Sequence, residues 1–377
     1  MDFGLSEEQE QLQQSARDFL ARECSPAFVR AVASSEDGGA RGFHEKLAAM
    51  GWTGLAIPDS FGGLGLSMLE LAVLSEEMGR AVMPGPFFAS SVLAALSLIN
   101  SGAAPLKKEW LPRIAAGEAI GTLAFIEESD RLDCQGVVAR VSKTRTGYRL
   151  NGVKMFVLDA QVADFLIVAA RSRAQGENGI CLFLVPRDTP GVTVQALPCV
   201  DQTRRPCEVV LRNVDVPASA RIADESKGWK ILTRVIEAAA VLVAADSLGG
   251  AQRALEMAVE YAKVREQFGR PIGSFQAVKH LCAEMVSEIE PARSLLWYAA
   301  YAYDNETRNA ARATSMAKAR LSDVYARTTN RSVQIHGGIG FTWEHDIHLW
   351  FKRAKWNEAA FGDATYHRER LAQLAGF

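Results

Sequence analysis

The sequence predicts a mainly helical α+β protein, and three observations support this class. Helical periodicity dominates residues 1–120 and returns from Gly228 almost to the last residue. Short apolar runs punctuated by proline and glycine lie between these two regions. The order helix, strand, helix favours separate layered units over an alternating βαβ fold. We therefore expect domains at residues 1–120, 121–224 and 225–377.

The first domain opens with a local signal for a helix. Ser6 followed by Gln9 fits a capping box, and Leu5 can act as the hydrophobic staple. A second helix is expected over residues 42–50, ending at Gly51 as its C-cap residue.

Glycine and proline divide the rest of this domain. Residues 58–65 contain so many of them that a turn is expected. A helix is predicted over residues 68–78, stopping at Gly79, and another over residues 87–100 after the break at residues 84–86.

The second and third domains differ in periodicity. Residues 147–152 carry turn residues at both ends, and residues 165–170 and 180–185 are apolar runs of strand length. Long periodic segments predict helices over residues 232–264, 274–303 and 309–335.

Charge and composition exclude several classes of function. The formal net charge is -2, so no basic excess favours nucleic acid or an anionic membrane. No stretch of 18 or more apolar residues is present, and the N-terminus lacks the basic and apolar regions of a signal peptide. We therefore expect a cytoplasmic protein that binds neither membrane nor nucleic acid.

Cysteine and histidine spacing predicts no metal site. The six cysteines include no C-x-x-C pair, so we expect buried or free thiols in a reducing cytosol. His345 and His348 can share one helix face, but without H-E-x-x-H a surface or supporting role is favoured over metal binding.

Residues 265–276 form a polar link, broken by Gly and Pro, between two predicted helices. This link contains an arginine, an aromatic residue and a glutamine, which suit a phosphate and a flat ring. A second block, residues 334–342, contains glycines whose backbone N–H groups can approach a pyrophosphate. Each block alone also fits a plain helix connector or a glycine-terminated helix.

Together these two blocks resemble the C-terminal helical domain of the acyl-CoA dehydrogenase family. The resemblance spans nearly the whole chain in the family's order, and it is also carried by residues 51–58, 61–65, 150–154 and 251–255. It implies an N-terminal helical domain, a central β-barrel-like domain and a C-terminal four-helix bundle. It also implies FAD, an acyl-CoA substrate and an electron-transfer flavoprotein as acceptor. The expected assembly is a homotetramer or an α2β2 heterotetramer.

The resemblance assigns FAD contacts residue by residue. Three positions match contacts made across a subunit interface, and three match the pyrophosphate and adenosine side. One aromatic in the β domain matches the residue near the flavin. In that order these residues are Arg265, Phe268 and Gln276, then Gln334, Gly337 and Gly338, then Phe156.

The catalytic base expected from the resemblance is missing. The family reaction needs a carboxylate to remove the α proton of the thioester while the β hydrogen leaves as hydride. The two positions where members carry this Glu hold Phe361 and Ala239. Glu237 is the nearest carboxylate and our candidate, although two residues turn a helix by about 200°. Asp246 is a weaker candidate, since it replaces a family glycine.

Other positions also depart from the family. Leu158 stands where a hydroxyl reaches the flavin, and Ala240 stands where an Arg helps bind acyl-CoA. Asp363 replaces a small hydroxyl residue, and its charge would repel phosphate. Residues 125–130 lack the usual Pro and Gly.

These departures leave three hypotheses. The chain is an acyl-CoA dehydrogenase with an unusually placed base, or the base-lacking partner subunit of a heteromeric dehydrogenase, as in some bacterial members. Alternatively, it is a flavoprotein of the same fold with altered chemistry on CoA thioesters.

Overall fold

The computed structural model describes residues 4–35 and 40–377, which form two compact units. Unit 1 comprises Met1–Ala31, Ser67–Met83 and Glu237–Phe377, and unit 2 comprises Val32–Leu66 and Pro84–Ile236. The long helix α7 (Gly228–Val264) begins in unit 2 and continues into unit 1.

Unit 2 is built on one sheet of eight strands. The hydrogen-bonded order is β6-β7-β3-β2-β4-β5-β8, and β1 adds to β4 in parallel. The strands are β1 (Gly121–Ala124), β2 (Arg140–Lys143), β3 (Gly147–Leu158), β4 (Phe165–Arg171), β5 (Ile180–Pro186), β6 (Val192–Ala196), β7 (Pro206–Pro217) and β8 (Arg221–Ala223). Central strands β4 and β5 are almost wholly buried, as their continuous apolar sequences require.

Helices of unit 2 pack beside this sheet. They are α3 (Ala40–Ala49), α5 (Ala95–Ile99) and α6 (Ala104–Ala115), together with a π-helical segment over Phe88–Ala94. Trp110 of α6 packs on Phe165 of β4 with ring centroids 4.5 Å apart. The buried Thr53 hydroxyl donates to the Ala115 carbonyl at 2.7 Å, which ties the predicted turn region to α6.

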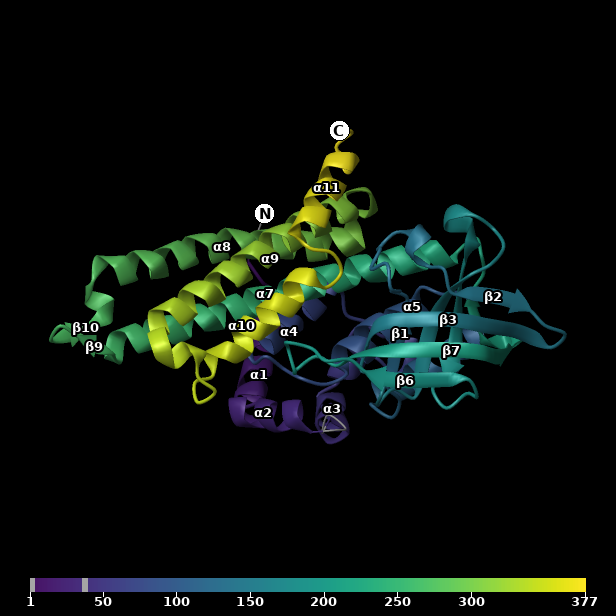
Figure 1. Cartoon of the computed structure of the whole chain (residues 1–377), viewed down its shortest axis with the longest axis horizontal. Helices are drawn as coiled ribbons and strands as arrows, with labels where there is room; N and C mark the ends of the chain where they lie inside the picture. Colours follow the sequence, from purple (N-terminus) through teal and green to yellow (C-terminus); the bar gives the residue numbers. More distant parts are fainter. Residues whose placement is uncertain (1–3, 36–39) are drawn as a thin grey trace. The chain divides into compact units, whose positions relative to one another are not determined.

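Unit 1 is a bundle of helices, of which the long C-terminal ones are drawn in green and yellow in Figure 1 and α1 in purple. Its helices are α1 (Glu7–Glu23), α4 (Met68–Arg80), most of α7, α8 (Gln276–Asn305), α9 (Thr307–His336), α10 (Ile347–Ala359) and α11 (Ala364–Leu374). A short hairpin of β9 (Glu266–Gln267) and β10 (Arg270–Pro271) joins α7 to α8. The helix α2 (Pro26–Ser34) spans the boundary between the units.

Local signals in the sequence are confirmed where the chain needs only near neighbours. Ser6 accepts from the Gln9 backbone at 3.3 Å, and Gln9 Oε1 accepts from the Ser6 backbone at 2.9 Å, so the capping box begins α1. The expected turn also forms, with Gly62 in the left-handed region after a single 3-10 turn.

Two glycines were misread as ends of elements. The helix α4 continues through Gly79 to Arg80. A Cβ at Gly79 would lie 2.0 Å from the Asp246 carbonyl oxygen of α7, so glycine is needed here for close packing. Strand β3 continues through Gly152 to Leu158. A Cβ at Gly152 would lie 2.4 Å from that of Ala139, so glycine lets the two segments approach closely. Both glycines permit close packing of neighbouring elements and do not terminate the element that contains them.

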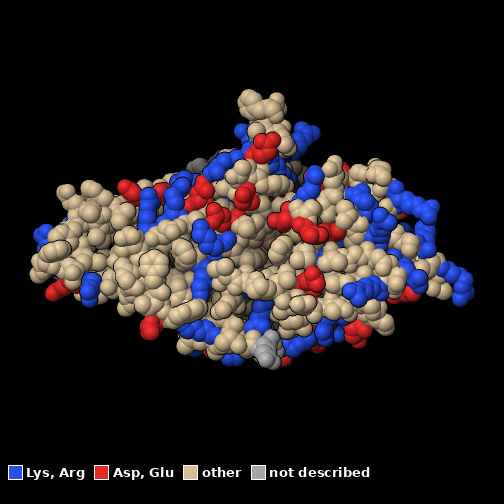
Figure 2. Space-filling view, viewed as in Figure 1, with Lys and Arg blue, Asp and Glu red and all other residues tan. Residues whose placement is uncertain are grey.

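The surface carries charges of both signs. Figure 2 shows acidic and basic side chains interspersed over most of the visible face, in agreement with a net charge of -2. Among the described helices, none is long and apolar enough to cross a membrane.

Candidate cofactor-binding and catalytic positions

The β9–β10 hairpin presents one group of predicted cofactor residues. Phe268 and Gly269 at its tip both have positive φ, at 54° and 74°, the geometry of a two-residue type I′ turn. The Phe268 side chain is 92% exposed. Arg265 precedes the hairpin and Gln276 begins α8, and both are exposed to solvent.

The C-terminal end of α9 presents a second group. Gln334 is exposed in the last turn, and Gly337 ends the helix at φ 63° and ψ -142°, a conformation open almost only to glycine. A Cβ built on Gly337 or Gly338 would meet nothing within 4 Å, so another molecule can approach this backbone closely.

An aromatic contact brings these two groups to the same end of the bundle. Tyr261 in the last turns of α7 stacks on the buried His336 of α9, with ring centroids 4.7 Å apart. Arg265 donates its backbone N–H to the Tyr261 carbonyl, and Gly337 directly follows His336. Figure 1 shows α7 and α9 ending near the hairpin. We had not singled out this ring stack, since its members lie 75 residues apart in sequence.

The donor set at this end of the bundle suits FAD. Exposed Arg265 offers a guanidinium, Gln276 and Gln334 offer amides, and the glycine turn offers an unobstructed backbone. These groups match phosphate and heterocycle oxygens and nitrogens, and exposed Phe268 offers a ring face. The residues present therefore fit the cofactor that the sequence implies.

The remaining predicted cofactor residue, Phe156, belongs to unit 2. It lies on β3 where the register with β7 shifts, and its φ of 56° turns the strand locally. Its side chain is 48% exposed, whereas Leu158 two residues later is buried. A half-exposed aromatic at a bulge is available for stacking against a flat ring.

A buried ion pair joins the segment before β2 to strand β3. Lys154 Nζ, fully buried, donates to Glu127 Oε1 at 2.6 Å. Glu127 also accepts from the backbone N–H groups of Val138 and Ala139 at 3.0 and 2.9 Å. Burial lowers the pKa of Lys154, although Glu127 opposes the shift. Glu127 therefore holds the unusual segment of residues 125–130 in place.

Both family positions for the base lie in well-packed parts of unit 1. Ala239 is fully buried in α7, and Phe361 is 7% exposed in the link between α10 and α11. Phe361 and Gly362 both have positive φ, at 56° and 96°. Ala240, at the position of the substrate arginine, is buried as well.

Two basic residues hold the Phe361–Gly362 turn. Lys318 Nζ donates to the carbonyls of Gly362 and Asn357 at 2.8 and 2.9 Å. A ring nitrogen of His367 lies 3.0 Å from the Phe361 carbonyl. Burial lowers the pKa of Lys318 to about 7 and that of His367 to about 3. Nothing in the local sequence indicates this role, because Lys318 lies 39 residues from Asn357 and 44 from Gly362.

The remaining carboxylate candidates are already paired. Glu237 is 8% exposed, and its Oε1 accepts from Arg370 Nη2. Asp246 is 4% exposed and accepts from Arg353 Nη1 and from Asn357 Nδ2, each at 2.7 Å. These contacts join α7 to α11 and to α10.

Asp363 has a local structural contact. Its carboxylate accepts from the Tyr366 backbone N–H at 2.7 Å and thereby caps α11. The side chain is exposed to solvent.

The cysteines and histidines form no ion site. All six cysteines are free. The ring of His345 packs against that of His336 with centroids 4.3 Å apart. His348 Nε2 lies 3.2 Å from Arg30 Nη2. Within residues 4–35 and 40–377, no group of three or more His, Cys, Asp or Glu residues could hold a metal.

An exposed arginine, two exposed amides, an exposed aromatic and an open glycine turn at one end of a helical bundle are groups suited to a ligand with phosphates and a ring. Residues 6–118, 122–214 and 226–375 match the N-terminal, middle and C-terminal domains of acyl-CoA dehydrogenases. The chain therefore belongs to the acyl-CoA dehydrogenase family of FAD-dependent oxidoreductases, which confirms the predicted family, fold class and cofactor.

Curated relatives cover almost the whole chain. A probable acyl-CoA dehydrogenase, YngJ of Bacillus subtilis, is 31% identical over 98% of both chains. The acyl-CoA dehydrogenase IpdE2 of Mycolicibacterium smegmatis is 32% identical over 98% of both chains. CarC of Acetobacterium woodii, a subunit of a caffeyl-CoA reductase-Etf complex, is 29% identical over 92% of both chains.

Solved structures give the same result. Butyryl-CoA dehydrogenase from Megasphaera elsdenii superposes with a TM-score of 0.91 at 28% identity over the whole of both chains. A chain of the ChsE4-ChsE5 complex from Mycobacterium tuberculosis gives 0.91 at 30%, also over the whole of both chains. The FAD complex of PigA gives 0.92 at 26%, over 100% of this chain and 99% of that one.

Proposed function

We propose that this chain is the base-lacking subunit of a heteromeric FAD-dependent acyl-CoA dehydrogenase. In this role it shares a cofactor with a companion chain that supplies the carboxylate for α,β-desaturation of an acyl-CoA thioester. The proposal rests on the residues found at the four positions considered for the catalytic base. Two of them hold Ala239 and Phe361, and the other two hold carboxylates committed to arginines.

A general base must place a free oxygen within hydrogen-bond reach of the proton that it removes. Glu237 accepts from Arg370, and Asp246 accepts from two donors in the interior of unit 1. Each carboxylate links α7 to a neighbouring helix, and removing Asp246 would take away an ion-pair partner of the buried Arg353. We infer that neither serves as the base.

The turn at the position that the resemblance assigns to the base is well ordered. Lys318 and His367 fix the carbonyls of Gly362 and Phe361, so the backbone is firmly held while the side chain is apolar. A substitution within a well-ordered turn supports the loss of one chemical group from a preserved scaffold. It is this combination that favours a partner subunit over a chain whose site has decayed.

The chemistry of the predicted cofactor residues suggests a role for each of them. Arg265, Gln276 and the Gly337 turn would hold the phosphates and adenosine side, and Phe156 would contact the ring system. FAD, when bound, supplies the acceptor for the hydrogen removed from the β carbon. The residues of this chain bind and orient the cofactor, and Phe361 fills the position of the base with an apolar ring.

Assembly and acceptor follow from the relatives. The ChsE4-ChsE5 complex contains two named chains, which supports an α2β2 assembly over a homotetramer for this protein. CarC works in a complex with Etf, which supports an electron-transfer flavoprotein as the acceptor. Domains at residues 1–120, 121–224 and 225–377 and a cytoplasmic location remain predictions.

The proposal is tested in the active assembly. Co-expression with the product of a neighbouring dehydrogenase gene should yield a yellow complex that oxidises acyl-CoA with an artificial electron acceptor. Glu237→Gln in this chain should leave kcat within about twofold of the parent complex, and Glu8→Gln on exposed α1 provides the matched control. A loss of kcat by a factor of about 100 or more with Glu237→Gln alone would make Glu237 the base and refute the proposal.

A further inference from the structure

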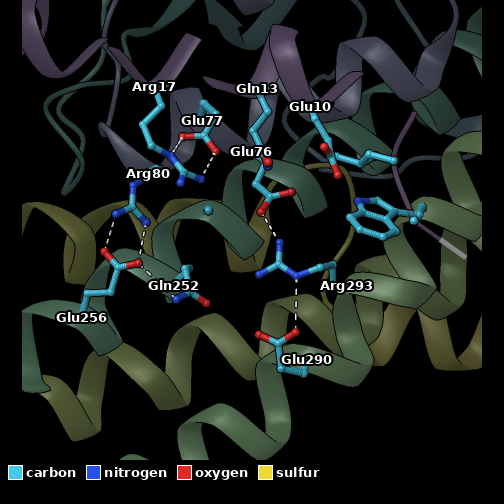
Figure 3. Close-up of a pocket in the computed structure, with 14 residues that line it drawn as sticks. Glu10, Gln13, Arg17, Glu76, Glu77, Arg80, Gln252, Glu256, Glu290 and Arg293 are labelled. Carbon is cyan, nitrogen blue, oxygen red and sulfur yellow. Dashed lines mark hydrogen bonds and ion pairs between the residues drawn. The ribbon is translucent and has the colours of Figure 1, made fainter. Parts of the chain in front are cut away.

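A polar pocket of about 390 Å³ lies within unit 1 among α1, α4, α7 and α8 (Figure 3). None of the residues assigned to FAD or to the base lines it. Its charged lining consists of five glutamates and three arginines, namely Glu10, Glu76, Glu77, Glu256, Glu290, Arg17, Arg80 and Arg293.

Two of the arginines are fully matched by one glutamate each. Arg17 donates to both carboxylate oxygens of Glu77, at 3.0 and 2.7 Å. Arg80 likewise donates to both oxygens of Glu256, one of them at 2.8 Å. Figure 3 shows these two pairs side by side along one wall of the pocket. Arg253 also contacts Glu256 at 3.4 Å, so neither Glu77 nor Glu256 leaves an unbalanced negative charge on this wall.

The third arginine is shared between two glutamates. Arg293 Nη1 donates to Glu76 Oε1, and its Nε lies 3.6 Å from Glu290 Oε2. Glu10 adds a further carboxylate from α1. Arg293 can balance only one of these three carboxylates, so carboxylates outnumber arginines among the lining residues. Arg253, which lies outside the lining, offsets part of this excess through its contact with Glu256.

Unpaired acceptors lie in the pocket lining. The Glu76 side chain is 5% exposed, and among the described residues its Oε2 has no hydrogen-bond partner. Gln252 Oε1 is buried and equally without a partner in the described chain. Figure 3 shows the second oxygen of Glu76 turned toward the side on which Glu10 lies. A buried carboxylate oxygen without a donor is unfavourable, and burial correspondingly raises the pKa of Glu76.

Trp297 adds a ring to the same pocket. Its indole Nε1 is buried and lacks an acceptor among the described residues. Indole faces attract cations, and the attraction increases where water is excluded. The lining thus combines an excess of carboxylates over arginines, two buried acceptors and the buried indole N–H donor of Trp297.

We propose that this pocket binds a small organic cation that carries N–H donors, a primary ammonium or a guanidinium. Such a group supplies the donors that Glu76 Oε2 and Gln252 Oε1 lack, and its charge offsets the excess of carboxylates. An anion would be repelled, and a neutral apolar ligand would leave both acceptors unpaired. The cation comes either from a free amine or from a lysine or arginine side chain of another subunit.

The experiment uses the full chain in its FAD-loaded assembly. Isothermal titration at low ionic strength with putrescine and with agmatine measures binding of free amines. Potassium chloride tests for simple counter-ion binding, and 1,4-butanediol tests for uncharged binding. Sedimentation velocity of the same samples measures subunit association. The variants are Glu76→Gln, Glu10→Gln and the control Glu8→Gln, which lies on α1 outside the pocket.

Glu76→Gln should weaken putrescine or agmatine binding by about tenfold or more, since it removes one charge-assisted hydrogen bond. Glu10→Gln lies at an exposed position and cannot unfold the bundle, and it should weaken binding roughly threefold. Glu8→Gln should change nothing.

If no free amine binds but Glu76→Gln and Glu10→Gln weaken subunit association, the cation is a side chain of another subunit. The proposal fails if neither readout responds to these variants. It also fails if 1,4-butanediol or potassium binds as well as the amines do.

Discussion

Arg265→Ala gives a quantitative test of the proposed cofactor surface. Arg265 is exposed, and the described chain shows no ion pair for its guanidinium, so its removal should leave the folded chain intact. The change should therefore appear in FAD affinity. A hydrogen bond to a charged group contributes about 1.5–3 kcal/mol, which converts to a rise in Kd of roughly 10- to 150-fold.

The assay is titration of the deflavinated assembly with FAD, followed by quenching of flavin fluorescence. Lys263→Ala is the matched control, because it removes the same charge from an exposed site at the end of α7. Its Kd should stay within about twofold of the parent. Equal losses in the two variants would reduce the effect to general electrostatics, and an unchanged Kd in Arg265→Ala would remove Arg265 from the cofactor site.

Three further predictions concern the stability of the folded chain. Because the pKa of Lys318 is lowered to about 7 in the folded chain, the unfolded chain binds more protons above that pH. The free energy of unfolding should then rise between about pH 7 and pH 10, and Lys318→Met should flatten this slope in denaturant titrations. Gly79→Ala should destabilise by about 1–3 kcal/mol, because its Cβ would meet α7 at 2.0 Å, whereas Gly42→Ala in open space should stabilise slightly. Asp246→Asn should cost about 3–5 kcal/mol in chemical denaturation because it removes the charge of an ion-pair partner of the buried Arg353, and a smaller loss would show that this pair is dispensable.

Local sequence signals predicted the parts of the fold that depend on near neighbours. The capping box at Ser6 and the turn at Gly62 involve residues within a few positions of one another, so spacing alone identified them. Glycine occurs at positions 79 and 152 for a different reason than at position 62. Each allows a distant element to pack closely, and that element is invisible in the local sequence.

The candidate site shows the same division. The hairpin and the glycine turn were recognisable because each is a continuous block of residues. The partners of the carboxylates were not, since Arg370 lies 133 residues from Glu237 and Arg353 lies 107 residues from Asp246. Sequence order could name Glu237 as the nearest carboxylate, but only the folded chain shows which arginine it accepts from.

The most direct test of the central claim is acyl-CoA oxidation by the FAD-loaded chain purified alone. The rate would be measured with an artificial electron acceptor over a series of acyl chain lengths, before and after adding the companion subunit. We predict no oxidation above background by the chain alone and full activity once the companion is present. Turnover by the chain alone at the rate of the complex would show that a base resides in this chain and would contradict the account.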